Sequence, residues 1–207
     1  RADYTNYMNS FYLQGGVDVS LERDWSAGMQ AIYNHSAPKP GNALSWTEVY
    51  DASTAVLDSL LYSNSDKDTS SDRLNLNFHT DKVWDDKGKK MTWDVDYLRD
   101  NRDEKVDVVS SALDFILPFE KYKITAGAKV SFTNTRNGIN YDTSDPTLVQ
   151  DDYFRYKEQI YALYADYSRE YSERFSMQLG LRMEHTRTTG ISEAKDTEDK
   201  HDYTRLF

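Results

Sequence analysis

The sequence predicts an all-β chain, folded as an antiparallel up-and-down meander of about eight strands. Apolar and polar residues alternate with a period of two in eight stretches, which is the pattern of strands with one apolar and one polar face. The stretches come in pairs joined by short turns, and the connections between pairs are mostly long. A Greek-key sandwich would mix long and short connections at both ends, so the asymmetry favours a meander that belongs to a barrel.

The eight predicted strands span residues 10–21, 25–33, 73–80, 90–98, 108–117, 122–132, 159–168 and 174–186. The last of them, RFSMQLGLRMEHT, has the most regular pattern. Its apolar residues, such as Leu179 and Leu181, alternate with polar ones, such as Gln178 and Arg182. A helix would have spread these apolar residues around its whole circumference, so the stretch is a strand. The terminal YTRLF begins like a ninth strand.

Short turns are expected near residues 22, 85, 119 and 171, and long surface loops at 34–72, 133–152 and 187–202. The first loop contains APKPGN and SNSDKDTSSD, which are rich in turn-forming residues. The connection 99–105 is short where the pattern calls for a long one, which fits an external segment that is absent from the chain.

The composition limits the classes of protein to consider. With 38% hydrophobic residues and a mean hydropathy of −0.81, the chain is polar for a protein of 207 residues with its own core. No apolar run approaches the roughly 20 residues of a spanning helix. A net charge of −10 argues against a nucleic-acid partner. The lack of cysteine excludes disulfides, thiolate zinc sites and cysteine nucleophiles.

The apolar strand faces could pack on a second sheet or meet lipid, and the aromatic residues favour lipid. On these faces, the residues beside short turns are Trp25, Tyr122 and Phe175, and those at the opposite strand ends are Phe11, Tyr33, Tyr97 and Phe132. Tyr33 lies eight residues beyond Trp25, and Phe132 lies ten beyond Tyr122. Along tilted strands these separations project to roughly 20–26 Å, close to the ~25 Å lipid-facing band of a membrane barrel.

The polar faces carry charged residues and glycines in mid-strand. The charged residues are Asp94, Asp96, Lys123, Lys129, Arg182 and Glu184, and the glycines are Gly16, Gly28, Gly127 and Gly180. In a sandwich this face would be the solvated outer surface, whereas in a barrel it would line a wet interior. Mid-strand glycines often mark a bend or a close approach by other groups, so they fit either barrel curvature or a plug inside the barrel.

Several stretches together resemble the outer-membrane β-barrel proteins related to TonB-dependent receptors of Gram-negative bacteria. They are FYLQGGVDVSLERDWSAGMQAIYNHS, KKMTWDVDYL, KYKITAGAKVSFTNT, FRYKEQIYALYADYS, ERFSMQLGLRMEHTRTTG and DYTRLF, which cover most of the chain. The resemblance implies that residues 1–207 are a partial barrel domain of a larger receptor. Such a receptor has about 22 strands, a plug, and a TonB-contacting segment. The chain shows neither plug nor TonB-contacting segment.

Motifs of catalysis and cofactor binding are absent, so we expect no enzyme, no catalytic residue and no cofactor. His35, His79, His185 and His201 are scattered and are expected to be ordinary surface residues. Asp66, Asp68, Ser70 and Asp72 alternate as in a calcium loop, but the glycine and closing glutamate of such a loop are missing, so no metal site is predicted. Asp94 and Asp96 are better explained as lumen lining than as a glycosidase pair. Ligand-binding residues cannot be read from the sequence.

Two hypotheses of function follow. In the first, the chain is a segment of a TonB-dependent receptor in the outer membrane of a Gram-negative bacterium, which takes up an unidentified small nutrient. Its partners would be outer-membrane lipid, the TonB system through a segment outside this chain, and the nutrient, with no nucleic acid. In the second, it is a stand-alone soluble β-barrel or sandwich that binds a lipid or a sugar. An enzyme on a β scaffold has no residues to support it.

Overall fold

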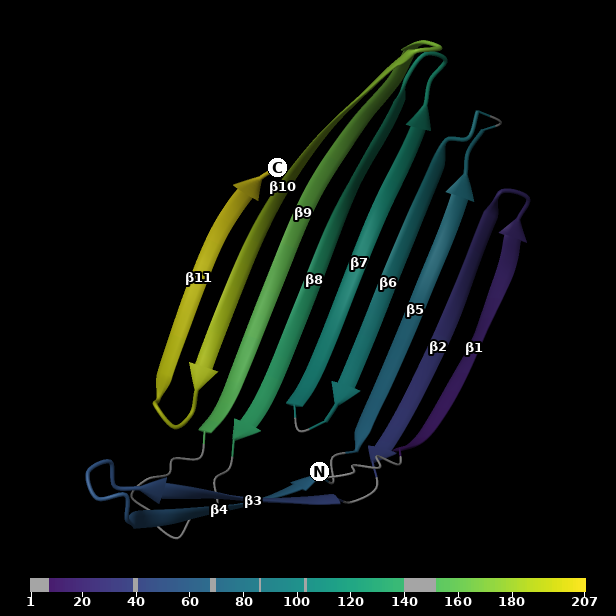
Figure 1. Cartoon of the computed structure of the whole chain (residues 1–207). Coiled ribbons are helices and arrows are strands. Elements are labelled where there is room, and N and C mark those ends of the chain that lie inside the picture. The colour runs from purple at the N-terminus through teal and green to yellow at the C-terminus, as the bar shows by residue number, and fades with distance from the viewer. Residues whose placement is uncertain (1–7, 39–40, 68–69, 86, 103, 140–151) are drawn as a thin grey trace.

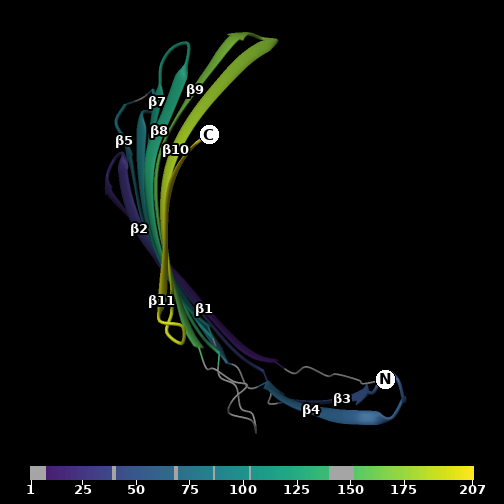
Figure 2. The same cartoon turned by 90° about the vertical axis from the view of Figure 1, so that its left-hand side faces the viewer.

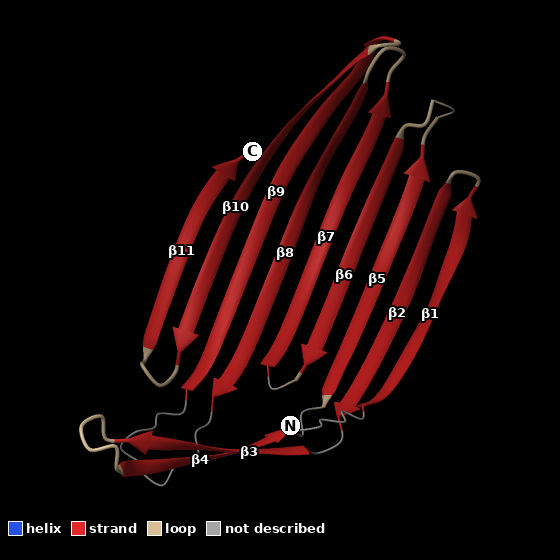
Figure 3. Cartoon of the chain, in the orientation of Figure 1, coloured by secondary structure: helices blue, strands red, loops and turns tan. Residues whose placement is uncertain are grey.

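The computed structural model describes residues 8–38, 41–67, 70–85, 87–102, 104–139 and 152–207. The strands in these ranges are β1 (Met8–Glu22), β2 (Trp25–Pro38), β3 (Gly41–Tyr50), β4 (Leu57–Lys67), β5 (Ser71–Val83), β6 (Lys90–Asn101), β7 (Glu104–Pro118), β8 (Lys123–Ile139), β9 (Asp152–Ser172), β10 (Phe175–Ser192) and β11 (Thr197–Leu206). Figure 3 shows strands and connections only. The described part of the chain contains no helix long and apolar enough to cross a membrane.

Nine of the strands form one antiparallel sheet in the order β1-β2-β5-β6-β7-β8-β9-β10-β11 (Figure 1). Each strand therefore pairs with its neighbour along the chain once the β3–β4 hairpin is set aside. The prediction of an all-β up-and-down meander is confirmed. All eight predicted strands are present, and each extends beyond its predicted bounds at one end at least, while β8 and β10 begin one residue later than predicted. The first four residues of the terminal YTRLF belong to β11, the ninth strand of the sheet.

The sheet is curved and open. Figure 2 shows it bending along the length of its strands, and Figure 1 places β1 and β11 at opposite edges. Among the described residues, β1 pairs only with β2 and β11 only with β10. One row of backbone donors and acceptors on each edge strand therefore has no sheet partner within the described chain.

The short turns lie together at one edge of the sheet, as predicted. They connect β1 with β2, β5 with β6, β7 with β8 and β9 with β10, at the upper edge in Figure 1. We call this the short-turn edge and the opposite one the loop edge. In an outer-membrane barrel the short turns face the periplasm and the longer loops face outside.

The prediction of one continuous surface loop at 34–72 is wrong. β2 continues to Pro38, β5 begins at Ser71, and the residues between them contain the two-stranded sheet of β3 and β4. This hairpin lies beyond the loop edge (Figure 1). Trp46 lies opposite Tyr62, an aromatic cross-strand pair of the kind that stabilises a ladder. The abundance of serine and aspartate concealed the alternation in SWTEVY and LDSLLYS.

Two other predicted loops are shorter than expected. β10 continues to Ser192 and β11 begins at Thr197, so the loop predicted at 187–202 is a tight turn in which Asp196 has a φ of 47°. Aspartate tolerates this left-handed conformation better than most residues, which allows the strands to continue to the turn. In the loop predicted at 133–152, β8 continues to Ile139 and β9 begins at Asp152. The part from 140 to 151 lies outside the described residues.

The connection at 99–105 is short, as predicted. β6 ends at Asn101 and β7 begins at Glu104, and the backbone N–H of Arg102 donates to the carbonyl of Glu104 over 2.9 Å. The loop edge thus carries a short turn between two pairs of strands.

Candidate functional site

The cross-strand register places the apolar residues of the nine strands on one face. Met29 of β2 lies opposite Phe78 of β5, which lies opposite Val95 of β6. Likewise, Leu163 of β9 lies opposite Met183 of β10. Because successive side chains leave opposite faces of a strand, the register also fixes the polar residues on the other side. We call the two sides of the sheet the apolar face and the polar face.

The apolar face is exposed. Val17 and Met29 are each 66% exposed, and Leu163 and Leu179 are 57% and 59% exposed. Within the described residues, Ala162 is the only apolar side chain that is fully buried. A water-soluble protein rarely leaves a continuous apolar surface of this kind uncovered, since each Å² removed from water contributes about 25 cal/mol. The face therefore requires an apolar environment.

A row of aromatic side chains borders the apolar face at the short-turn edge. Its members are Trp25, Trp84, Phe115, Phe119, Tyr122, Tyr167, Tyr171 and Phe175. Ring centroids of the contacting pairs are 4.5 to 6.1 Å apart. The indole Nε1 of Trp25 donates to the hydroxyl of Thr80 over 2.8 Å. The polar tips and apolar rings of these residues suit a boundary between water and hydrocarbon.

A second aromatic row borders the same face near the loop edge, and it consists of Phe11, Tyr33, Tyr97, Phe132 and Tyr161. Phe132 and Tyr161 meet edge to face with their centroids 6.0 Å apart. The hydroxyl of Tyr33 donates to Asp72 over 2.5 Å, and that of Tyr97 donates to Asp107 over 3.0 Å. The hydroxyl groups of these two tyrosines thus bond to carboxylates on the side away from the apolar band.

The two rows enclose an apolar band of the height expected for a membrane barrel. Tyr122 and Phe132 are ten residues apart at the two ends of this band, a separation that projects to roughly 25 Å along the membrane normal for a strand tilted by about 40°. Residues 57–207 match the outer membrane protein beta-barrel family. The chain belongs to this family. A comparison with curated proteins found no match.

The match covers about three quarters of the chain, from β4 to the end of β11. The protein is thus an outer-membrane protein, and the nine-stranded sheet is part of the wall of a transmembrane β-barrel. In such a barrel the apolar face is the outer one and the polar face is the inner one. The inner face is therefore the candidate functional surface, together with the structures at the loop edge.

Gly28 allows an ion pair across two strands of the inner face. It lies on β2 between Asp18 of β1 and His79 of β5. The Oδ1 atom of Asp18 and the Nε2 atom of His79 are 2.8 Å apart. A Cβ atom at Gly28 would collide with both of these side chains. Glycine leaves the space through which Asp18 and His79 meet.

This pair is part of a longer series of side-chain hydrogen bonds across the inner face. His79 Nδ1 lies 3.0 Å from Asn77 Oδ1, and Asn77 Nδ2 donates to Asp96 over 2.8 Å. The hydroxyl of Ser110 donates to the other oxygen of Asp96 over 3.4 Å. The chain of contacts thus runs from β1 to β7.

Gly127 allows a second bridge on the inner face. It lies on β8, and above it the hydroxyl of Tyr164 on β9 donates to Asp114 on β7. A Cβ at Gly127 would collide with both partners. The guanidinium of Arg182 lies 5.7 Å from the centre of the Tyr164 ring and pairs with Glu184 over 2.7 Å. These contacts fix the polar side chains of β7 to β10 against one another.

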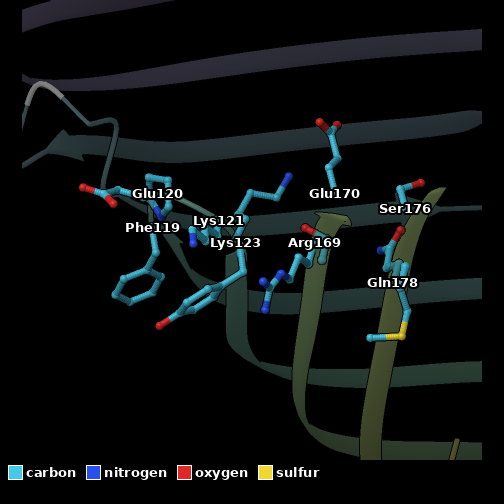
Figure 4. A pocket seen from close by; sticks show the side chains of 12 residues that line it. Phe119, Glu120, Lys121, Lys123, Arg169, Glu170, Ser176 and Gln178 are labelled. Atoms are coloured by element: carbon cyan, nitrogen blue, oxygen red, sulfur yellow. The ribbon is translucent and has the colours of Figure 1, made fainter. Parts of the chain in front are cut away.

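A hollow of about 590 Å³ lies at the short-turn edge, between the β7–β8 turn and the adjacent ends of β9 and β10 (Figure 4). It contains both signs of charge at each side, with Glu120, Lys121 and Lys123 at the β7–β8 turn and Arg169 and Glu170 at the end of β9. No group of three or more potential metal ligands occurs within the described residues. No hydrogen-bonded pair of nucleophile and base occurs among the residues that line the hollow. The hollow lies at the short-turn edge, at the opposite end of the strands from the loop edge.

The histidines singled out from the sequence do not come together. His35 lies 2.8 Å from Asp72, His185 lies 3.1 Å from Asp202, and His201 lies 3.3 Å from Asp199. These three pairs lie near the loop edge, away from the bridge made by His79.

The expected absence of a calcium loop was based on four residues, of which Asp68 lies outside the described residues. Asp72, the last of them, bonds to Tyr33 and His35. Asp94 and Asp96 do share the inner face, as predicted, and Asp96 bonds to Asn77. Sequence reasoning placed the glycines on this face but missed the bridges over them, because those bridges depend on the register between strands.

Proposed function

We propose that the chain forms part of the barrel of a TonB-dependent receptor, which takes up an unidentified small nutrient through the outer membrane of a Gram-negative bacterium. The observation that carries the proposal is the open nine-stranded wall. In a bilayer the free edges of β1 and β11 need partners, because the hydrocarbon offers no water to their backbone groups. A sheet of nine strands with two free edges suits a barrel with more strands, and outer-membrane barrels of about 22 strands are transporters with a plugged lumen.

The structure of the inner wall favours a barrel whose interior holds a plug domain. Its polar side chains are bonded to one another across several strands, from Asp18 to Ser110 and from Asp114 to Glu184. Bonded side chains of this kind form a firm, hydrophilic surface against which a plug domain can pack and past which a solute can move. The energy for such movement would come from the TonB system through a segment outside this chain.

The β3–β4 hairpin is the part of the described chain best placed for first contact with a ligand. It lies beyond the loop edge, and Trp46, Tyr50 and Tyr62 are 67%, 54% and 66% exposed. Binding sites of receptors commonly lie on loops held by a rigid scaffold. The partners proposed for the whole protein are thus the nutrient, outer-membrane lipid on the outer face, and the TonB system. We propose no enzymatic activity, no cofactor and no nucleic-acid partner.

The alternative, a stand-alone soluble protein that binds a lipid or sugar, is disfavoured by the exposed apolar face. A soluble sandwich or barrel buries such a face in its interior. In the described residues Val17, Met29 and Leu179 have no second sheet over them.

Nutrient depletion from the growth medium tests the proposal. The medium components removed by wild-type cells are compared, by mass spectrometry, with those removed by cells lacking the full-length gene and by cells lacking TonB. We expect the same compound to remain in the medium in both mutants. A compound whose uptake requires this gene but continues without TonB would contradict TonB-dependent transport while leaving the barrel assignment intact.

A further inference from the structure

We propose that Lys105, Arg136 and Arg155, on the outer face at the loop edge, bind the phosphate groups of an anionic lipid of the outer leaflet, such as lipopolysaccharide. These three residues, which we call the basic cluster, come from the adjacent strands β7, β8 and β9. Lys105 lies opposite Arg136, and Arg136 lies opposite Arg155. The inference rests on the outer-membrane barrel alone and does not depend on the proposed transport.

The three cations are neighbours and have no counter-ion within the described part of the chain. Cβ atoms of directly opposed residues are about 5 Å apart, and like charges placed in this way destabilise a sheet. Within the described residues, none of the three forms an ion pair with an acidic side chain. The arrangement therefore has no explanation in the stability of the strands themselves. An anion with several oxygen atoms would remove the repulsion.

Two other arginines on the outer face near the loop edge form ion pairs with acidic side chains. Arg99 pairs with Asp107 over 3.2 Å, and Arg187 pairs with Asp202 over 3.1 Å. Both pairs lie on the outer face: Arg99 and Arg187 are on β6 and β10, the strands next to the cluster, and their partners are on β7 and β11. These two cations thus have acidic partners, whereas the three cations of the cluster have none among the described residues.

The basic cluster borders a hollow of about 640 Å³. Gly138 and Tyr153 are paired in register on the same face, and the Tyr153 ring occupies the space where a side chain at Gly138 would stand. Glu193 also lines the hollow and is its one acidic residue, so the lining keeps a net positive charge. Two guanidinium groups and one ammonium group can offer several charge-assisted hydrogen bonds to one phosphate.

The depth of the cluster favours a lipid headgroup over a dissolved ion. Arg136 lies four residues beyond Phe132 of the aromatic row, which is ~13 Å along the strand and roughly 10 Å along the membrane normal. The headgroup layer begins at the aromatic row and is about 5–8 Å thick on each side of the bilayer, and the long side chains of arginine and lysine can span the remaining distance. The loop edge faces outside, where lipopolysaccharide presents its phosphates to the protein.

Lipid binding by the full-length protein tests the inference. Protein purified in detergent and freed of lipid is titrated with purified lipopolysaccharide in mixed micelles, and bound lipid is measured from its hydroxylated acyl chains. The test variant replaces Lys105, Arg136 and Arg155 with glutamine. The control is Arg187→Gln, which removes a cation of the same face that already has partners. We expect the triple variant to bind at least about tenfold more weakly and the control to match the wild type.

Equal binding by the triple variant and the wild type would overturn the proposal. Displacement of lipopolysaccharide by millimolar inorganic phosphate would show that the cluster takes free phosphate, which contradicts the lipid assignment. If the triple variant fails to show the gel mobility of a folded barrel, Arg155→Gln and Arg155→Lys replace it. The glutamine variant should bind more weakly and the lysine variant should recover part of the affinity, whereas equal binding by both and by wild type would overturn the proposal.

Discussion

At the scale of single residues, contacts across the inner wall depend on two glycines, whose lack of a side chain leaves room for neighbouring side chains to meet. Gly28 and Gly127 each lie between two side chains that meet above them, Asp18 with His79 and Tyr164 with Asp114. The sequence shows that these glycines share the polar face. It cannot show the bridges, because the partners are separated by as many as 61 positions and meet only through the register of the sheet.

Replacing Gly28 with alanine should break the bridge between Asp18 and His79. The new Cβ would displace the ends of both side chains, and we expect the free energy of unfolding to be about 0.2–1 kcal/mol lower than that of Gly15→Ala. Gly15→Ala on the adjacent strand is the control for an added methyl group alone, since Gly15 lies on the outer face and nothing lies within 4 Å of a Cβ there. Denaturant unfolding of the full-length protein in lipid vesicles measures both variants. Equal stability of Gly28→Ala and Gly15→Ala would contradict the role given to the bridge.

At the scale of elements, the strands were predictable and their ends were not. Alternation identified β1, β2 and the six strands from β5 to β10, because one apolar face imposes a period of two. Near the loop edge the outer face becomes charged, as at Arg99 and Arg187, and the apolar signal ends before the ladder does. The hairpin of β3 and β4 was missed for the same reason, since its polar composition is that of a loop.

The turn of this hairpin provides a pH-dependent test. The Oδ1 atom of Asp51 accepts hydrogen bonds from the hydroxyl of Ser53 (2.6 Å), the backbone amide of Thr54 (2.8 Å), the amide of Ser53 and the hydroxyl of Thr54. These bonds favour the ionised carboxylate and hold the pKa of Asp51 well below its ordinary value of 3.8. A lowered pKa in the folded turn means that the stabilisation is present above pH 3.8 and is lost as the pH falls toward the lowered pKa.

Hydrogen exchange of the hairpin amides measures this effect, with rates corrected for the intrinsic pH dependence. At neutral pH, Asp51→Asn should exchange faster than the wild type, and the difference should shrink as the pH falls below 3.8. Asp58→Asn is the control, because Asp58 lies in the same hairpin and its carboxylate accepts no hydrogen bond among the described contacts. This variant should leave the exchange rates unchanged. Equal protection of Asp51→Asn and wild type at neutral pH would contradict the role of the carboxylate in the turn.

At the scale of the whole molecule, the sheet is a wall with two different sides. Two aromatic rows border its apolar face. On its polar face, side chains of neighbouring strands form hydrogen bonds with one another. The sequence predicted both sides, including the aromatic residues at both ends of the apolar faces, because each strand carries the pattern independently. The open edges at β1 and β11 and the balance of charge along the loop edge required the structure, because both are properties of neighbouring strands.

The most direct test of this account is the environment of each side chain along β10 in the full-length protein in membranes. Because the chain has no cysteine, single cysteines carrying spin labels can be placed at positions 176 to 183 and their accessibility to oxygen and to a water-soluble nickel complex compared. We predict strict alternation, with Met177, Leu179, Leu181 and Met183 reached by oxygen from the lipid and the positions between them reached only from the aqueous side. The same accessibility at neighbouring positions, or access of the nickel complex to Leu179 and Leu181, would contradict a wall with lipid on its apolar face.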